Sequence, residues 1–220
     1  FRGVREAIDP NLVIDEEPVK GRIYIAGVDI ARYSDFTVIT ILRDDGRQVF
    51  FDRFTGMSWE SQITRIVNAA FKYNAMIIMD STGIGDAVLE QTRSRCYDIG
   101  LEQHVMGYTF TAGSKQEIME ALSIDIERKK LQLRNVDVQT NELMAYTYDV
   151  TPTGHVRMTA PEGMHDDTVC SLALANWGCR RTGEVTIKED KREIPADGQR
   201  VPYDELPDYK PEVNPDEYEV

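Results

Sequence analysis

The chain has 220 residues, of which 41% are hydrophobic, and a formal net charge of −13. That length holds one α/β core with room for a tail. No apolar run approaches the length of a bilayer span and no secretory signal opens the sequence, which predicts a soluble protein. The acidic charge argues against broad nucleic-acid affinity, because phosphate binding depends on Lys and Arg. The three cysteines (Cys96, Cys170 and Cys179) form no metal-binding pattern and are expected in the core of a protein from a reducing compartment.

The two ends of the chain differ in composition from its middle. Residues 1–21 lack a sustained hydrophobic period and contain Pro10 and Pro18, so we interpret them as a linker. Residues 184–220 hold twelve acidic and five basic residues, a net charge of −7, together with five prolines. That composition is typical of an extended or disordered interaction arm, and equally of a solubilising strap. A single folded domain is therefore expected over residues 22–183.

The first part of this domain predicts three meandering strands followed by a crossover. Apolar, β-branched runs predict strands, with an Asp-Gly hairpin signal between the last two, over residues 22–30, 36–42 and 48–54. Ser58 is a suitable N-cap for an amphipathic helix that follows them. This helix leads to an apolar strand that ends at Asp80, and a helical crossover of this kind predicts that the strand lies parallel to the first.

The second part alternates helices with short strands. We expect a helix over residues 86–96, a strand over 104–108, a helix from the capping box Ser114-Lys-Gln-Glu117 to about Lys130, a helix over 138–146, a hairpin over 148–158 and a helix over 165–180. This order predicts an α/β fold. Its mixed sheet has antiparallel strands 1–3 plus parallel strands, and helices flank both faces.

Acidic residues stand where three of these elements meet loops. Asp29 and Asp80 each end a strand that is apolar on both faces, and the pair Asp166-Asp167 opens the last helix. Ionised carboxylates in such places are costly unless a cation compensates them. Hard divalent ions such as Mg²⁺ or Mn²⁺ bind carboxylate oxygens, and two of them can activate a water and stabilise the leaving oxygen of a phosphodiester. The pattern therefore predicts a metal-dependent nuclease.

Each of these residues also has a structural interpretation. Asp29 and Asp80 could form turns, and Asp166 or Asp167 could cap the helix, although a cap needs only one of the two. His165 could orient a ligand, shuttle a proton or be structural. Candidates for contact with a DNA backbone are Arg32, Lys115 and the cluster Arg128, Lys129 and Lys130 with Arg134. For the cluster, the alternative is a solvated helix end that complements its dipole.

Three motifs together resemble the C-terminal nuclease domain of tailed-phage large terminase subunits. They are Gly27-Val-Asp29-Ile-Ala31 with Asp35 and Thr37 beyond it, Met79-Asp80-Ser-Thr-Gly83-Ile-Gly85-Asp86, and Ala160-Pro-Glu-Gly163-Met-His165-Asp166-Asp167-Thr-Val-Cys-Ser-Leu-Ala-Leu-Ala175. The resemblance covers residues 1–181. It implies a ribonuclease H-like fold and two-metal cleavage of concatemeric double-stranded DNA during genome packaging, with little sequence specificity because backbone contacts carry no base information.

The same resemblance implies roles, partners and a location. By motif match, Asp29, Asp80 and Asp167 would be the central metal ligands, with Asp166 an alternative or additional ligand and Asp35 an auxiliary acid. The family's usual N-terminal packaging ATPase domain is absent, since the chain has no phosphate-binding loop of the Gly-x4-Gly-Lys-Ser/Thr type, and residues 1–21 would remain from the interdomain connection. The implied partners are double-stranded DNA, the portal and the small terminase subunit, with no membrane, in the cytoplasm of the infected bacterial host.

Three other functions are compatible with the same sequence features. A Holliday-junction resolvase or transposase-like nuclease could use the same acids on a more basic surface. An actin-like sugar or acid kinase could bind nucleotide phosphates at a Gly-x-Asp strand end and a glycine turn. A non-catalytic docking module of a packaging motor would use the acidic tail and leave the acids merely structural.

Overall fold

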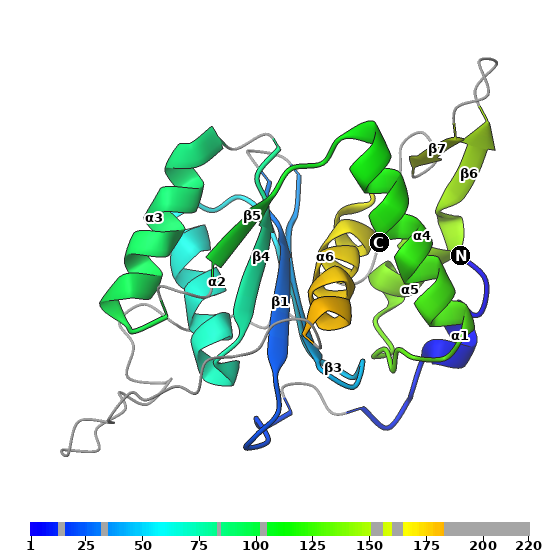
Figure 1. Cartoon of the computed structure of the whole chain (residues 1–220), viewed down its shortest axis with the longest axis horizontal. Helices are drawn as coiled ribbons and strands as arrows, with labels where there is room; N and C mark the ends of the chain where they lie inside the picture. The colour runs from blue at the N-terminus through cyan, green and yellow to red at the C-terminus, as the bar shows by residue number, and fades with distance from the viewer. Residues whose placement is uncertain are drawn as a thin grey trace. The chain divides into compact units, whose positions relative to one another are not determined.

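A mixed sheet of five strands forms the centre of the fold (Figure 1). The strands are β1 (Tyr24–Asp29), β2 (Thr37–Arg43), β3 (Gln48–Phe54), β4 (Met76–Asp80) and β5 (Val105–Tyr108), in the spatial order β3-β2-β1-β4-β5. The pairs β1–β2 and β2–β3 are antiparallel, whereas β4 is parallel to β1 and β5 is parallel to β4. Both the predicted meander and the predicted parallel crossover are confirmed.

The computed structural model describes residues 1–12, 16–31, 35–82, 85–101, 105–150, 156–159 and 165–182. All of these residues fall within one unit, residues 1–186. The expected tail over 184–220 and the tip of the expected 148–158 hairpin lie outside the described residues. No helix in the described part of the chain combines the length and the apolar character that crossing a membrane requires.

Helices cover both faces of the sheet, as expected (Figure 1). One face carries α2 (Trp59–Tyr73) and α3 (Gly85–Asp98), and the other carries α4 (Ala112–Glu127), α5 (Asp137–Ala145) and α6 (Asp167–Arg181). The smaller elements are α1 (Val4–Ala7) and an antiparallel pair formed by β6 (Thr147–Val150) and β7 (Val156–Thr159). Each face has its own apolar cluster: Ala26 and Val28 of β1 contribute to the cluster on the first face, and Ile25 to the cluster on the second. This alternation explains why β1 has no charged residue before Asp29.

The N-cap predicted for α2 is confirmed, whereas the one predicted for α4 differs from the N-cap in the structure. Ser58 caps α2, since its hydroxyl accepts a hydrogen bond from Ser61 N. The capping box expected at Ser114–Glu117 is wrong: Thr111 is the N-cap of α4, its Oγ1 accepts from Ser114 N at 3.1 Å, and Ser114 Oγ accepts from Thr111 N at 2.8 Å. The sequence offers two overlapping capping patterns here, and the extended backbone of Thr111 selects the earlier one.

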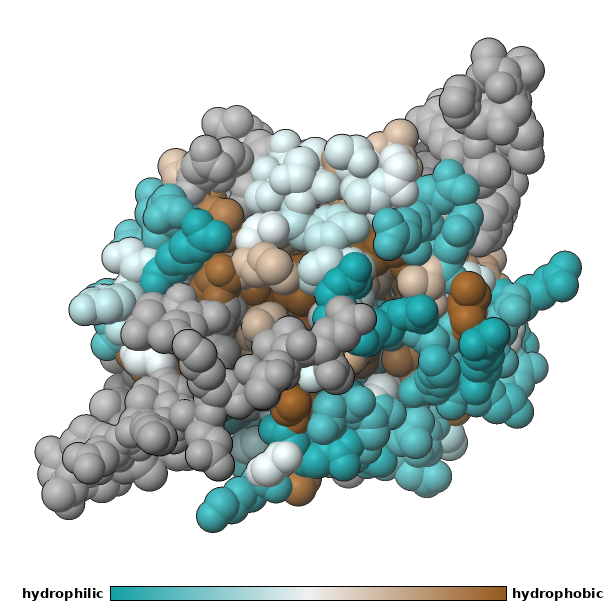
Figure 2. Space-filling view, in the orientation of Figure 1, coloured by the Kyte–Doolittle hydropathy of each residue, from teal (hydrophilic) through white to brown (hydrophobic). Residues whose placement is uncertain are grey.

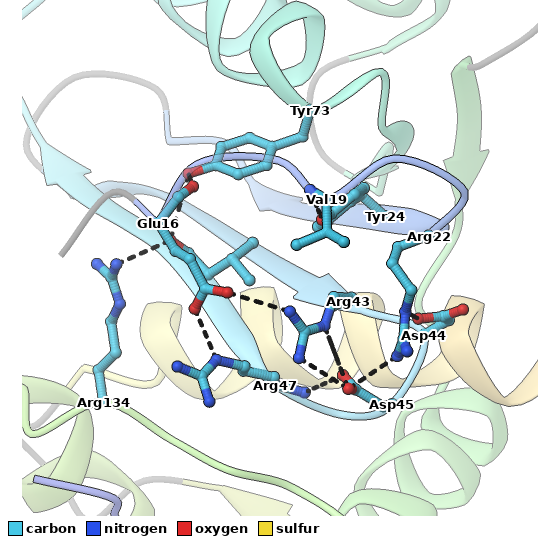
Figure 3. A network of polar contacts seen from close by, with 11 residues as sticks. Glu16, Val19, Arg22, Tyr24, Arg43, Asp44, Asp45, Arg47, Tyr73 and Arg134 are labelled. Atoms are coloured by element: carbon cyan, nitrogen blue, oxygen red, sulfur yellow. Dashed lines mark hydrogen bonds and ion pairs between the residues drawn. The ribbon is translucent and has the colours of Figure 1, made fainter. Parts of the chain in front are cut away.

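Residues before β1 pack against the domain in the described structure. Val4 and Ala7 of α1 are buried in the cluster that contains α4 and α6, and the Phe1 ring stacks on Tyr146 at 5.3 Å between centroids. Farther along, Glu16 accepts from Arg43 Nη1 at 3.1 Å and from Arg47 Nε at 2.6 Å (Figure 3). The role of residues 1–21 as a linker stays a prediction.

Helix α6 lies directly across β1 because Gly27 has no side chain. Ser171 Oγ donates to Gly27 O at 2.9 Å, and a Cβ on Gly27 would collide with Ser171 O and Ala175 N. This close approach brings the start of α6 to the end of β1 at which Asp29 stands.

Replacing Gly27 with Ala is therefore expected to lower the free energy of unfolding by about 1–3 kcal/mol, because the collision involves backbone atoms of α6. Gly113→Ala is the matched control, since nothing lies within 4 Å of the Cβ it would add. Urea denaturation of both variants measures the difference. Equal loss of stability in the two variants would contradict the close packing of α6 on β1.

Candidate active site

Acids from three distant parts of the chain meet at one edge of the sheet. Val28 pairs with Met79 in the parallel β1–β4 ladder. Asp29 and Asp80 are the next residues on these two strands, so they stand at the same edge of the sheet. The start of α6 brings Asp166 and Asp167 to that edge. The four carboxylates interact there: burial raises the pKa of Asp29 well above its usual value, the negative charges of Asp167, Asp80 and Asp166 raise it further, and Lys115 opposes them.

Asp167 has a buried oxygen without a donor. Its side chain is 15% exposed, and within the described residues its Oδ2 has no hydrogen-bond partner. His165 Nδ1 lies 3.6 Å from that oxygen, too far for a hydrogen bond. Burial raises the pKa of Asp167, and the charges of Asp166 and Asp35 add to this, while His165 and Arg53 oppose it. A cation beside Asp167 would satisfy the oxygen and reduce the repulsion.

Asp80 is both a turn former and a member of the site. Its Oδ1 accepts from Thr82 N at 2.8 Å and from Thr82 Oγ1 at 2.5 Å, which is the local turn that the structural interpretation expected. Both bonds end on the same oxygen. They fix the orientation of the carboxylate at the end of β4, so the turn supports a ligand role instead of replacing it.

Asp166 bonds to a lysine instead of capping its own helix. It occupies the N-cap position of α6 without a capping hydrogen bond from its side chain. Its Oδ2 accepts from Lys115 Nζ at 2.9 Å. Burial would lower the pKa of Lys115, but nearby negative charge, including that of Asp166, outweighs burial and raises it. Lys115 is therefore a protonated, positively charged group at the edge of the site.

The donor set fits a hydrated hard cation. No three His, Cys, Asp or Glu side chains of the described residues form a ready-made cage around one point. Magnesium, however, keeps several of its waters and needs only one or two direct carboxylate ligands. The carboxylates supply oxygen donors only, and the unpartnered Oδ2 of Asp167 and the mutual repulsion at Asp29 both favour a cation. Asp29, Asp80 and Asp167 are the residues that would hold it.

Three other residues were predicted to belong to the site: Asp35, His165 and Arg32. Asp35 is exposed, and its charge acts on Asp167. His165 contacts the Phe36 ring edge-on at 5.6 Å between centroids, and its Nδ1 atom lies 3.6 Å from Asp167 Oδ2. Arg32 lies outside the described residues, as do parts of the second and third motifs, at 83–84 and 160–164.

The basic cluster lies at the opposite end of α4 from Lys115. Helix α4 has 16 residues, so its ends are about 24 Å apart. Arg128, Lys129 and Lys130 follow its last turn, and Lys130 Nζ pairs with Asp125 Oδ1 at 3.1 Å. Arg134 is 3% exposed and donates to Val49 O at 2.8 Å, so the expectation that it contacts DNA is wrong. A role for the other three in DNA binding stays a prediction.

Sequence reasoning missed one residue of the surroundings, Glu142 of α5. Its side chain is buried, and its Oε2 accepts from Thr168 N at 3.0 Å, one residue after Asp167. The pairing spans 26 positions in the sequence. A glutamate in a short helix gives no signal of such a partner.

Comparison with known proteins finds similarity to large terminase subunits of phages and to their nucleases. No protein-family model matches the chain. The large terminase subunit of Thermus virus P23-45 is 29% identical over 159 residues, which is 70% of this chain and 31% of that protein, so the chain spans about a third of its length. The large terminase nuclease of thermophilic phage G20c with bound magnesium has a TM-score of 0.69 and 25% identity, covering 80% of this chain and 95% of that one. The same nuclease with bound cobalt has a TM-score of 0.66 and 27% identity, covering 74% and 84%.

Proposed function

Because the chain belongs to the nuclease domains of phage large terminase subunits, which share the ribonuclease H-like fold, we propose that it is a metal-dependent endonuclease. Its substrate would be concatemeric double-stranded viral DNA, cut during genome packaging in the cytoplasm of the infected bacterium. The observation that carries the proposal is the convergence of Asp29, Asp80 and Asp167 at one sheet edge. The magnesium and cobalt bound to the G20c nuclease support divalent ions as its cofactors.

The roles of the side chains follow from their surroundings. Two Mg²⁺ or Mn²⁺ ions, when bound, would supply an activated water and a counter-charge for the leaving oxygen. Asp29, Asp80 and Asp167 would hold them, with Asp166 as an additional ligand that Lys115 keeps in place through the 2.9 Å bond. Asp35 and His165 would act as auxiliary groups, since both interact with Asp167.

The same edge of the sheet offers weak contacts for a DNA backbone. Helices α3, α4 and α6 all begin there, and helix N-termini favour phosphate groups. The surface over the end of β5 and the start of α4 is pale in Figure 2, neither strongly hydrophilic nor hydrophobic. Ser81 and Thr109 are among the hydroxyl residues that follow β4 and β5. Such contacts read no bases, so cleavage is proposed to have little sequence specificity.

Partners follow from the proposed role in packaging. The ATPase domain of the same subunit, the portal and the small terminase subunit are the proposed partners, and Arg32, Arg128, Lys129 and Lys130 remain proposed DNA contacts together with Lys115. Given the net charge of −13, the isolated chain is expected to bind DNA weakly and with strong salt dependence.

Incubation of the purified chain with supercoiled plasmid tests the proposed activity. In Mn²⁺ or Mg²⁺ the plasmid is expected to be nicked and then linearised at many positions, and EDTA is expected to stop the reaction. A strong preference for four-way junctions over duplex DNA would favour a resolvase-like nuclease. Absence of any metal-dependent cleavage would contradict the proposal and favour the docking module.

A further inference from the structure

The start of α6 is capped by a side chain from another helix. Glu142 of α5 is 4% exposed, and its Oε2 accepts from both Thr168 N, at 3.0 Å, and Thr168 Oγ1, at 2.5 Å. Thr168 is fully buried and directly follows Asp167. The first N–H groups of a helix have no partner within the helix, so a buried one needs an acceptor from elsewhere. Glu142 is that acceptor for Thr168.

This arrangement changes what Asp166 and Asp167 are free to do. An Asp at the N-cap usually turns its carboxylate back onto N–H groups of its own helix. Here the side chain of Asp166 makes no such bond and instead reaches Lys115. The Oδ2 of Asp167 likewise has no hydrogen-bond donor within the described residues. With the cap supplied by Glu142, both carboxylates can face the site.

Glu142 also pairs with an arginine of the sheet. Arg53 Nη2 of β3 lies 3.9 Å from Glu142 Oε1, and the Arg53 guanidinium stacks over the Phe36 ring at 3.3 Å from its centroid. The Phe36 ring in turn contacts His165. A series of contacts therefore links side chains of α5, β3 and the segment before β2 to the start of α6.

We propose that Glu142 is a positioning residue: it caps α6 in place of Asp166 and thereby keeps the carboxylates of Asp166 and Asp167 directed at the metal site. The inference rests on the proposed function, in which those carboxylates hold a divalent ion. Groups that orient metal ligands typically change metal affinity by about 10–100-fold when they are removed. Without Glu142, one of the two acids is expected to turn inward and cap the helix.

The test compares three variants by their affinity for Mn²⁺ in calorimetry. Glu142→Ala is expected to weaken Mn²⁺ binding by about tenfold or more. Glu142→Gln is expected to stay within about threefold of the wild type, because its amide oxygen can still accept both bonds from Thr168. Asp125→Asn is the matched control: Asp125 accepts from Asn176 and Arg180 near the other end of α6, so this variant should lose stability without losing Mn²⁺ affinity.

Amide hydrogen exchange of the metal-free protein gives a second readout. The Thr168 amide is expected to exchange at least tenfold faster in Glu142→Ala than in the wild type and Glu142→Gln, since it loses its acceptor. Unchanged exchange at Thr168, or equal Mn²⁺ affinity in Glu142→Ala and the wild type, would overturn the inference. A wild-type chain that binds no Mn²⁺ would instead contradict the proposed function, while the exchange measurement still decides the capping role.

If Glu142→Ala does not fold, Thr168→Val replaces it in the Mn²⁺ measurement. This variant keeps the shape of the side chain but removes one of the two bonds to Glu142. It is expected to weaken Mn²⁺ binding by a few fold and to leave the protein folded. Wild-type Mn²⁺ affinity in Thr168→Val would then overturn the inference.

Discussion

Asp80→Asn and Asp29→Asn are each expected to reduce Mn²⁺-dependent plasmid cleavage by about 1,000-fold, because a metal that stabilises the transition state by several kcal/mol loses a carboxylate ligand. The fold should survive both changes. In Asp80→Asn, the amide oxygen of the new side chain can still accept both bonds that Thr82 donates to Asp80 Oδ1 in the wild type. Cleavage time courses with equal amounts of each folded variant measure the loss.

The melting temperature of the Asp29→Asn variant provides a second test of this prediction. The pKa of Asp29 is raised by burial and by the charges of Asp167, Asp80 and Asp166, so its ionised form is unfavourable in the metal-free protein. Replacing it with neutral Asn should therefore raise the melting temperature of the metal-free chain while removing activity. Asp98→Asn, at an exposed position on α3, is the control and should cleave like the wild type. Retained cleavage in either site variant would contradict the assignment.

Asp125→Ala is expected to lower the free energy of unfolding by about 2–3 kcal/mol. The Asp125 side chain is 2% exposed, and its oxygens bind Arg180 Nη1 at 2.6 Å, Lys130 Nζ at 3.1 Å and Asn176 Nδ2 at 3.1 Å. The expected loss is smaller than for a fully buried pair, because Arg180 and Lys130 are 41% and 56% exposed and can be hydrated. Urea denaturation near neutral pH measures it.

An exposed ion pair provides the control for this prediction. Glu90 and Arg93 of α3 are 2.5 Å apart but 64% and 41% exposed, so Glu90→Ala should change stability by less than about 0.5 kcal/mol.

The interactions of Asp125 also predict that the stability of the protein depends on pH. Burial raises the pKa of Asp125, but its bonds to Arg180, Asn176 and Lys130 lower it overall. Its contribution is therefore present above the unfolded-state pKa of Asp and disappears as the pH falls through the folded-state value. A wild-type protein that loses no more stability on acidification than Asp125→Ala would contradict this.

The sequence was sufficient to predict the sheet and the edge at which the acids meet. The amphipathic helix after the three-strand meander returns the chain to the sheet, so the apolar run ending at Asp80 is expected to lie parallel to the run ending at Asp29. Parallel neighbours end at the same edge. The motif that opens the last helix could be placed at that edge only through the resemblance. Helix α6 can pack closely on β1 because Gly27 has no side chain. A glycine within a strand does not predict which helix will pack against it.

Long-range partners of single side chains could not be predicted in the same way. The alternatives of cap and ligand for Asp166 stayed open because the actual capping group, Glu142, comes from another helix. Arg134 looked like part of a solvated basic cluster. In the structure, however, Leu133 forms a β-bridge with Ile8, and the neighbouring Arg134 is buried and bonded to Val49 O. Such contacts depend on how elements pack, and composition and periodicity do not report that.

Anomalous scattering from crystals of the chain soaked in Mn²⁺ would show whether Asp29, Asp80 and Asp167 form one metal site. We expect anomalous peaks at the sheet edge within about 2–2.5 Å of carboxylate oxygens of Asp29 and Asp80, with Asp167 completing the site. Mn²⁺ found only elsewhere on the surface, with these three carboxylates binding none, would contradict it.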